Sequence, residues 1–405
     1  MSAPIDIPLA IYVHFPWCVS KCPYCDFNSH ALRGELPEVS YVAALARDLA
    51  HQVETMSAAL AGRKIVSVFL GGGTPSLFSP QAIARVLENL RTALPFAPQA
   101  EITLEANPAT IERGRFAEYA AAGVNRVSLG AQSFDTEALR RLGRIHVPEE
   151  TRRAAEELHA GGLPNFNLDV MYGLPGQDAA GAVRDLQEAL ALNPAQLSHY
   201  HLTLEPGTPF AARPPAGLPD DALTDAMLEA CQDLLANAGF HRYEVSAYAR
   251  PGQQCRHNLV YWRFGDYLGL GAGAHGKLSE RDAQTGHLRI RRTTQQRDPR
   301  RFQRDPAASW TATEVEAEQR PFEFMLNGLR LTAGVSDRDF EMHTGLPWQA
   351  IAQPRQRLVT RGLLEGQDER RAVPTARGLR FLNDVLVEFL PAASTPDQSM
   401  HNAPK

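Results

Sequence analysis

The first half of the chain alternates short apolar runs with longer segments whose apolar residues recur every three and four positions. A short apolar run that ends in Gly, Pro, Asn or another polar residue predicts a β-strand. Recurrence at three and four positions predicts an amphipathic helix instead. The predicted strands are the runs IPLAIYVHF, RKIVSVFLGGG, EITLEANP, NRVSLGAQ, NFNLDVMYGLP and QLSHYHLT.

Helical patterns separate these strands and follow the last of them. Six successive strand–helix steps favour a parallel sheet, because parallel strands need crossover connections. The fold class is therefore α/β, with the six strands in either an open doubly wound sheet or an incomplete barrel. The predicted helices cover about 40–56, 79–93, 110–122, 134–142, 148–162, 178–192 and 219–238, and a further strand covers 242–249.

The pattern changes in the last third of the chain. The stretch HLRIRRTTQQRDPRRFQR carries seven arginines between Arg289 and Arg304, and we predict an exposed arginine-rich connector over 281–320. A helix that ends in RGLLE, a short strand pair and a T-x-x-G turn then predict a winged-helix-like domain over 321–390. The polar, proline-containing segment 391–405 is typical of a disordered tail.

The composition is that of an ordinary soluble protein, with 44% hydrophobic and 21% charged residues among 405. This length accommodates a main domain over 1–280 and a smaller second domain. The formal net charge of −5 gives no reason to expect nucleic-acid binding, so a role without DNA is favoured over a DNA-binding regulator. The N-terminus lacks the features of a signal peptide, and no run approaches the about 20 apolar residues of a membrane-spanning helix. We therefore expect a cytoplasmic protein.

Three cysteines follow the first predicted strand with the spacing C-x3-C-x2-C. Cys18, Cys22 and Cys25 have no fourth cysteine after them, whereas four cysteines close an electron-transfer cluster. Three thiolates would bind three irons of a [4Fe-4S] cluster and leave the fourth iron open to a chelating small molecule such as S-adenosylmethionine (SAM). A disulfide between Cys22 and Cys25, or a zinc site completed by His14 and His30, is the alternative.

Polar and glycine residues gather where the predicted strands end. Gly71–Thr74, Glu105–Pro108, Gln132 and Asp169 each follow or close a strand, as the cysteines do. Because ligands of α/β proteins bind at the carboxyl edge of the sheet, we expect one shared site there. Glu105 and Asp169 are suited to ribose hydroxyls or, alternatively, to capping the following helices.

Two further features have a ligand-binding and a structural interpretation. Arg144 offers a guanidinium that suits a carboxylate. His257, beside Tyr261 and Trp262, is either a haem ligand or a hydrogen-bonded residue of the core. The arginine-rich segment is suited to haem propionates or anionic lipid headgroups, or it is a solvated face.

Together, these motifs resemble those of the radical-SAM family related to oxygen-independent coproporphyrinogen III oxidase. The shared features are the cysteine run, GGGTP, LEANP, G-x-Q-S, R-x-H at Arg144 and D-x-x-Y-G-L-P. The resemblance implies a partial (β/α)6 barrel with a C-terminal winged-helix-like domain, and a [4Fe-4S] cluster on Cys18, Cys22 and Cys25. By motif position, it implies SAM contacts from Tyr12, Tyr24, Gly72, Gly73, Thr74, Glu105, Gln132, Arg144, Asp169 and Thr203.

Two departures separate this sequence from the true oxidases of the family. The oxidases carry another cysteine two positions after the third, where this chain has Phe27, and they have a longer N-terminal extension. The run Cys-Asp-Phe and HNLVYW are similar to the HemW-type haem chaperones. That branch implies haem as a third ligand, with His257 as the haem candidate, and haem delivery to membrane-bound haem proteins. Peripheral membrane association and a homodimer stay open, and coproporphyrinogen oxidation in porphyrin metabolism is the alternative activity.

Overall fold

The computed structural model describes residues 5–108 and 115–391. The chain divides into two compact units, Met1–Glu314 and Val315–Lys405. The start of the helix predicted at 110–122 and nearly all of the predicted tail lie outside the described residues.

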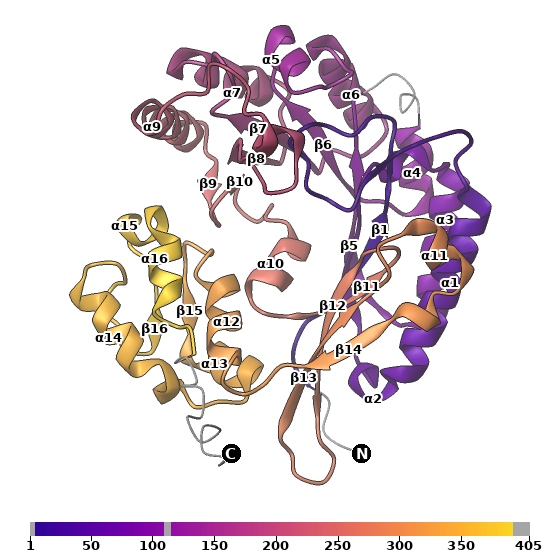
Figure 1. The fold of residues 1–405 in the computed structure, drawn as a ribbon, viewed down its shortest axis with the longest axis vertical. Helices are drawn as coiled ribbons and strands as arrows, with labels where there is room; N and C mark the ends of the chain where they lie inside the picture. The colour runs from indigo at the N-terminus through magenta and orange to yellow at the C-terminus, as the bar shows by residue number, and fades with distance from the viewer. Residues whose placement is uncertain (1–4, 109–114, 392–405) are drawn as a thin grey trace, which may run out of the picture. The chain divides into compact units, whose positions relative to one another are not determined.

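The first unit is built on six parallel strands that follow one another in the sheet in chain order (Figure 1). Each of the six coincides with one of the predicted apolar runs. Each also pairs in parallel with the next. The strands are β1 (Leu9–Phe15), β4 (Ile65–Gly72), β5 (Phe96–Ala106), β6 (Arg126–Gln132), β7 (Phe166–Tyr172) and β8 (Gln196–His201).

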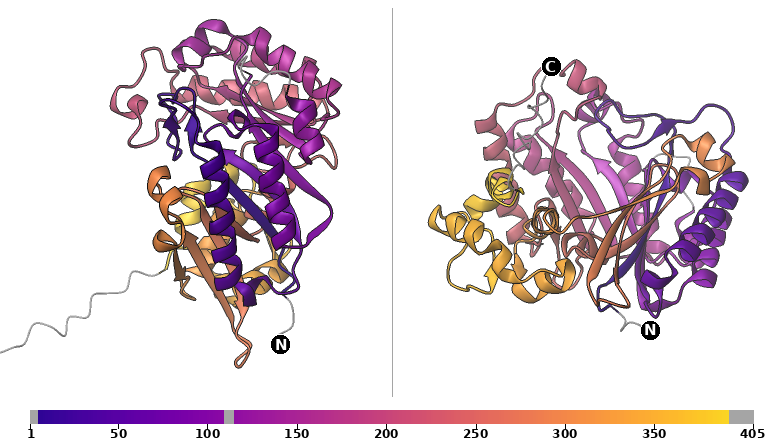
Figure 2. Two further views of the ribbon diagram at one scale, coloured as in Figure 1. Left: turned by 90° about the vertical axis from the view of Figure 1, so that its right-hand side faces the viewer. Right: turned by 60° about the horizontal axis from the view of Figure 1, so that its bottom comes forward.

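Helices cover one face of this curved sheet (Figures 1 and 2), and polar side chains lie on the opposite face. On β5, for example, Ile102 and Leu104 belong to the apolar core, whereas Thr103 and Glu105 point to the opposite side. The covering helices are α1 (Glu38–Thr55), α2 (Ser57–Leu60), α3 (Pro80–Ala93), α4 (Phe116–Ala122), α5 (Thr136–Arg141), α6 (Pro148–Ala160), α7 (Ala179–Ala191) and α9 (Asp221–Asn237).

The sheet continues beyond the six strands at both edges without closing. Its order runs from β14 to β9 over twelve strands, and these two edge strands do not pair with each other in the described sheet. The partial (β/α)6 barrel is therefore confirmed, and the doubly wound alternative is wrong, because all six strands follow in chain order with no switch point.

The predicted arginine-rich connector over 281–320 is wrong for most of its length. β11 (Asp266–Leu270) pairs in parallel with β1, and three antiparallel strands follow it. The run LRIRRTT alternates, so that Leu288 and Ile290 are buried while Arg289 and Arg291 meet carboxylates on neighbouring strands. The added strands are β12 (His275–Arg281), β13 (Leu288–Thr294) and β14 (Thr311–Glu314), with α11 (Pro299–Arg304) before the last.

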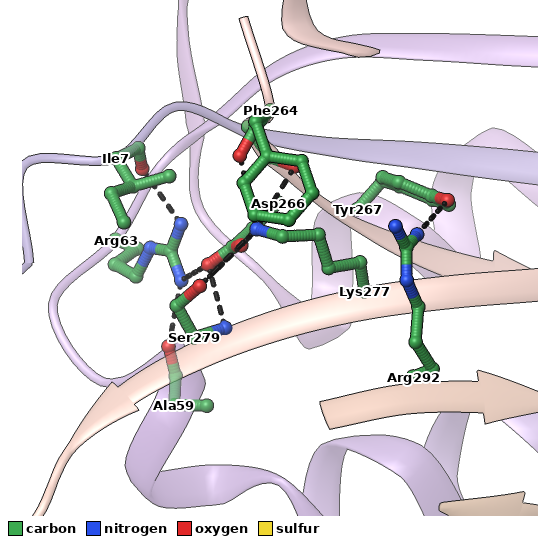
Figure 3. A network of polar contacts seen from close by, with 10 residues as sticks. Ile7, Ala59, Arg63, Phe264, Asp266, Tyr267, Lys277, Ser279 and Arg292 are labelled. Carbon is green, nitrogen blue, oxygen red and sulfur yellow. Dashed lines mark hydrogen bonds and ion pairs between the residues drawn. The ribbon is translucent and has the colours of Figure 1, made fainter. Parts of the chain in front are cut away.

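A buried ion network joins this extension to the parallel strands (Figure 3). Asp266 lies 2.8 Å from Arg63 Nη1 and 2.6 Å from Lys277 Nζ, and all three side chains are almost fully buried. Arg63 also donates to the carbonyl of Ile7, and Lys277 lies over the ring of Phe264. Every charge in the network has a partner, as a buried ion requires.

The opposite edge of the sheet also departs from the sequence expectation. The strand predicted at 242–249 is a hairpin of two short strands, β9 (His241–Arg242) and β10 (Ala247–Ala249). The HNLVYW run that follows forms the helix α10 (Arg256–Trp262). A short helix α8 (Pro209–Ala212) lies in the connection between β8 and α9.

The second unit has its own apolar core, in which Phe324 packs edge-on against Phe340. Short helices surround a two-stranded antiparallel sheet of β15 (Val335–Ser336) and β16 (Arg371–Ala372). This arrangement fits the predicted winged-helix-like domain, which begins at 315 rather than 321. Its helices are α12 (Arg320–Gly328), α13 (Asp337–Thr344), α14 (Ala352–Thr360), α15 (Ala376–Arg380) and α16 (Leu382–Val387). None of the helices in the described part of the chain has the length and apolar character that crossing a bilayer requires.

Candidate functional site

A cleft with an empty volume of about 760 Å³, partly open to solvent, lies at the carboxyl edge of the parallel strands. Most of the predicted site residues line it. They are Cys18, Cys22, Cys25, Tyr24, Gly72, Gly73, Thr74, Glu105, Gln132, Arg144 and Asp169.

The three cysteines lie on one loop whose base is a short strand pair. β2 (Trp17–Cys18) pairs in parallel with β3 (His30–Ala31). Inside the loop, the N–H of Cys25 donates to the carbonyl of Cys22 at 3.2 Å. Two further carbonyls of the loop accept hydrogen bonds from Lys21 Nζ. These bonds fold the loop back on itself, so that all three thiols lie at the cleft.

Each thiol has a polar partner of its own. Donors to sulfur stabilise a metal-bound thiolate and tune the potential of an iron–sulfur cluster. In the metal-free loop, burial is the main reason why the pKa of Cys18 is raised to about 11, so metal binding must displace that proton. The pairs are Arg144 Nη1 with Cys22 Sγ at 3.7 Å, Ser29 Oγ with Cys25 Sγ at 3.6 Å, and Thr74 with Cys18.

The arrangement argues against the zinc alternative. Within the described residues, no three His, Cys, Asp or Glu side chains converge to hold a single metal ion. Structural zinc needs four ligands around one ion. A [4Fe-4S] cluster instead places each thiolate on a different iron, so its ligands need not converge on one point. The cysteine set therefore fits a cluster better than a single ion.

The glycine-rich turn after β4 packs against the segment that leads to the cysteines. The N–H groups of Gly73 and Thr74 donate to the carbonyls of Phe15 and Trp17, each at 2.7 Å. A Cβ on Gly73 would lie 2.5 Å from the Trp17 carbonyl oxygen, and Gly72 has a φ of +115°. The glycines thus allow a close approach of two backbone segments at the wall of the cleft.

Two half-buried carboxyls face the cleft from β5 and β7, on either side of β6. Glu105 Oε2 accepts the N–H of Gly72 at 2.9 Å, and Asp169 accepts hydrogen bonds from Asn167 and Ser128. Burial first, and then the charge of Asp169, raise the pKa of Glu105 to about 8. Burial raises the pKa of Asp169 as well. The partners of both carboxyls lie on strands, and neither residue caps the helix that follows it, since α4 and α7 begin at other cap residues. Both carboxyls remain suited to hydroxyl or cationic groups of a ligand.

Arg144 is the cation of the cleft. Its Nη2 donates to the carbonyl of Gly130 at 2.9 Å and to Asn107, and its Nε is buried with no hydrogen-bond partner in the described structure. A buried donor without an acceptor is costly, which favours a carboxylate ligand at this position. Gln132, which pairs with Val170 of β7, accepts the hydroxyl of Tyr200 at 2.6 Å. Gln132 adopts a φ of +64°, a strained conformation that concentrates at functional sites.

Two predicted SAM contacts do not line the cleft. Tyr12 lies on the polar face of β1, where its hydroxyl is 2.9 Å from His14 Nδ1. Thr203 follows β8 and is exposed, with its hydroxyl directed to the carbonyl of His201. Both remain predictions of the motif resemblance rather than of the geometry.

His257 is a buried residue of the core. This is the second of the two interpretations that the sequence left open, the first being a haem ligand. Only 2% of the residue is exposed. Its ring stacks on Phe69 at 5.0 Å, meets Tyr261 edge-on, and places Nδ1 3.0 Å from Ser67 Oγ. Burial lowers the pKa of His257 to about 3. In this conformation the ring is closed off from a ligand as large as haem.

Several residues of the cleft were given no individual role by the sequence. Tyr200 and Asn107 hydrogen-bond to predicted residues, and Phe27 lies at the cleft with 59% of its surface exposed. Asn107 stands inside the LEANP motif, so its position was a usable signal. Tyr200 lay in a run interpreted only as a strand, where the alternation of faces could have identified it.

Comparisons with known proteins agree with this geometry. Residues 12–189 match the Radical SAM superfamily and residues 315–381 match the HemN C-terminal domain. The chain is 48% identical to the "Heme chaperone HemW" of Escherichia coli over 95% of this chain and 98% of that protein. It is 44% identical to the Haemophilus influenzae protein of the same name, with the same coverage.

A solved structure shows the same fold. It is that of coproporphyrinogen III oxidase (HemN) from Escherichia coli, a radical SAM enzyme, with a TM-score of 0.78 at 24% identity. The match covers 96% of this chain and 91% of the other.

Proposed function

The chain belongs to the HemW family of haem chaperones within the radical-SAM superfamily, and from that premise we propose how its cleft and its haem function are related. Membership of the family implies a [4Fe-4S] cluster and SAM, and the protein is a haem chaperone on that scaffold. We propose that Cys18, Cys22 and Cys25 bind the cluster and that SAM occupies the rest of the cleft. We further propose that the protein delivers haem to membrane-bound haem proteins from the cytoplasm.

The convergence of three thiols and of separate polar partners on one cleft carries the cofactor proposal. Three thiolates leave one iron of the cluster open, and the orphaned Nε of Arg144 stands close to Cys22. A ligand that chelates this iron would therefore present its carboxylate to Arg144. When bound, the cluster and SAM supply one-electron reduction and a radical capable of abstracting hydrogen.

The chain's own residues hold and orient these groups. Arg144 joins the cysteine loop to β6 by bonding both Cys22 and the carbonyl of Gly130. Glu105 and Asp169 present acceptors from the floor of the cleft, where the hydroxyls or the amine of SAM would find partners. Tyr24 lies on the cysteine loop itself, at the wall of the same cleft.

A transfer assay tests the chaperone function. The reconstituted protein would be loaded with haem under anaerobic conditions and mixed with an apo-haemoprotein held in a membrane, and the Soret band of the acceptor would be followed. We expect transfer faster than from free haem or haem-albumin. Transfer no faster than these controls would contradict the proposal.

The alternative activity has its own assay. Incubation with coproporphyrinogen III, SAM and a reductant would produce protoporphyrinogen if the chain were an oxidase. We expect no product at enzymatic rates, because Phe27 stands at the cleft where the oxidases have a further cysteine.

The triple variant of Cys18, Cys22 and Cys25 to alanine should lose the brown cluster absorbance. Retention of that absorbance would refute the ligand assignment.

A further inference from the structure

The last residues of β6 depart from the regular sheet just where they reach the cleft. The register with β7 shifts between Leu129 and Gln132, so that Gly130 and Ala131 together face a single residue of β7. Such a bulge takes backbone groups out of the ladder and redirects side chains, and it is common beside functional sites. The end of β6 therefore depends on partners from elsewhere in the chain.

The bulge ends in a tight turn centred on Gln132. The N–H of Ser133 donates to the carbonyl of Ala131 at 2.8 Å, across the single residue between them. Gln132 has a φ of +64°. A three-residue turn with a positive φ at its centre is rare and strained. A strained turn persists only when surrounding contacts hold it in place.

The segment before α6 supplies these contacts. Arg144 Nη2 donates to the carbonyl of Gly130 at 2.9 Å, and His146 Nε2 lies 3.1 Å from the carbonyl of Ala131. A carbonyl oxygen only accepts hydrogen bonds, so Nε2 is the nitrogen of the ring that carries the proton. Two residues of one short segment thus bind two successive carbonyls of the bulge.

His146 itself lies behind the wall of the cleft. Only 3% of the residue is exposed, and it is not one of the described residues that line the cleft. Burial first, and then the charge of Arg144, lower the pKa of His146 to about 3, so the ring is neutral. Its Nδ1 is buried without a hydrogen-bond partner in the described structure. Because such an orphaned acceptor is costly, an apolar side chain would fill this space better, and the bond to Ala131 is what requires a histidine.

The bulge supports two side chains that face the cleft. Gln132 and Arg144 both line it. A Cβ on Gly130 would lie 2.9 Å from the amide nitrogen of Gln132 and 3.3 Å from Arg144 Nη2, so both side chains lie against the same stretch of backbone. A displacement of the bulge would therefore move both of them.

We propose that His146 is a positioning residue for SAM, which acts through Gln132 and Arg144 without touching the ligand. Its bond to the Ala131 carbonyl holds the strained turn, and thereby the direction of the Gln132 side chain. The same bond fixes the segment that carries Arg144 against β6. The inference rests on the proposed function, because it takes SAM as the occupant of the cleft.

The test compares two amides at position 146. The side-chain nitrogen of glutamine stands about where Nε2 of histidine does, whereas that of asparagine is one carbon short of it. His159→Asn is the control, because His159 Nε2 also lies 3.1 Å from a carbonyl, that of Leu192, but at the exposed end of α6. Each full-length protein would be reconstituted with its cluster and titrated with SAM in a calorimeter.

We expect His146→Asn to weaken SAM binding about tenfold, and His146→Gln to stay within about threefold of the wild type, as for other residues that orient a ligand's direct contacts. His159→Asn should leave the affinity unchanged. Equal affinities of His146→Asn and the wild type would overturn the inference. An equal loss in His146→Gln and His146→Asn would overturn it too, because the ring would then act only through its shape.

A double-mutant cycle tests whether His146 acts through the two side chains. We expect His146→Asn to weaken SAM binding by a smaller factor in the Arg144→Ala background, and also in the Gln132→Ala background, than in the wild type. The same factor in all three backgrounds would overturn the inference.

Two further measurements keep the outcome clear. If His146→Asn did not fold in denaturant titrations, His146→Leu, which better keeps the bulk of the ring, would take its place in every comparison. Failure of the wild-type protein to bind SAM would overturn the proposed occupant of the cleft. Tight binding of SAM by the wild type and by His146→Asn alike would overturn only the role of His146, so the two failures are distinguishable.

Discussion

Glu105 makes the stability of the folded chain depend on pH, because the cleft raises the pKa of its carboxyl group. Its carboxyl is buried beside Asp169, and its pKa rises from an ordinary 4.5 to about 8. Between these values the folded chain keeps a proton that the unfolded chain releases. The folded state then binds more protons than the unfolded state, so this residue reduces stability progressively as the pH rises from about 4.5 to about 8.

Replacement of Glu105 by glutamine should remove this pH dependence. The amide oxygen still accepts the N–H of Gly72, and no proton is exchanged on unfolding. We expect the metal-free variant to gain stability over the wild type between about pH 5.5 and about pH 8.5 in denaturant titrations. Glu137→Gln is the control, because arginine neighbours lower the pKa of exposed Glu137 to about 2, so its difference from wild type stays constant in this range. A constant difference for Glu105→Gln would contradict the prediction.

His257 gives a second prediction at the residue scale. Because its ring packs between Phe69 and Tyr261 and its Nδ1 meets Ser67, His257→Ala should cost about 3 kcal/mol of stability, as other large-to-small core changes do. Added imidazole should not restore any lost haem absorbance, since the ring acts through packing. Restoration of the Soret band by imidazole, together with unchanged stability, would identify His257 as an axial ligand.

At the scale of elements, the six parallel strands and most of their helices were predictable because each carries a continuous apolar or amphipathic pattern. The strand β13 was not predicted, although apolar and polar residues alternate in its run LRIRRTT. Its arginines suggested exposure, and their partners Glu280 and Glu314 come from neighbouring strands that the sequence does not align. The helix α10 was missed for a similar reason, since Glu101 of β5 accepts the N–H groups of Arg256 and His257 at its start.

The part of the candidate site that lies at the carboxyl ends of the strands could be predicted from the sequence. Residues at the end of a parallel strand or directly after it, such as Glu105 and Thr74, meet at one edge of the sheet. Tyr200 was missed because no motif marks it: alternation along its strand gives the face on which it lies, but its hydrogen bond to Gln132 crosses β7 and appears only in the structure.

The junction between β1, β11 and β12 can be tested through its buried ions. Asp266→Ala would leave Arg63 and Lys277 buried without their counterion (Figure 3). We expect a loss of about 3–5 kcal/mol in the free energy of unfolding, measured by denaturant titration. Glu314→Ala removes a partly exposed partner of Arg289 on the same extension and should cost at most about 1 kcal/mol. Similar losses for the two variants would show that the network does not act as a buried ion cluster.

At the scale of the whole molecule, the candidate site lies within one of the two compact units. Every residue that lines the cleft belongs to Met1–Glu314. The second unit has a separate core around Phe324 and Phe340. We infer that the cofactor site is complete within the first unit.

Two truncations test this inference and the domain boundary together. A chain of residues 1–314 keeps all twelve strands of the main sheet. We expect it to fold, to acquire the cluster absorbance and to bind SAM with an affinity within about twofold of the full chain. A chain that ends at residue 280, where the sequence placed the boundary, loses β13 and β14 and exposes the edge of β12 as a template for aggregation. It should therefore be insoluble or fail to hold a cluster.

If the shorter chain folded and bound SAM as well as the longer one, the extension would not be part of the first domain. If the longer chain folded without holding a cluster, the cofactor site would depend on the second unit.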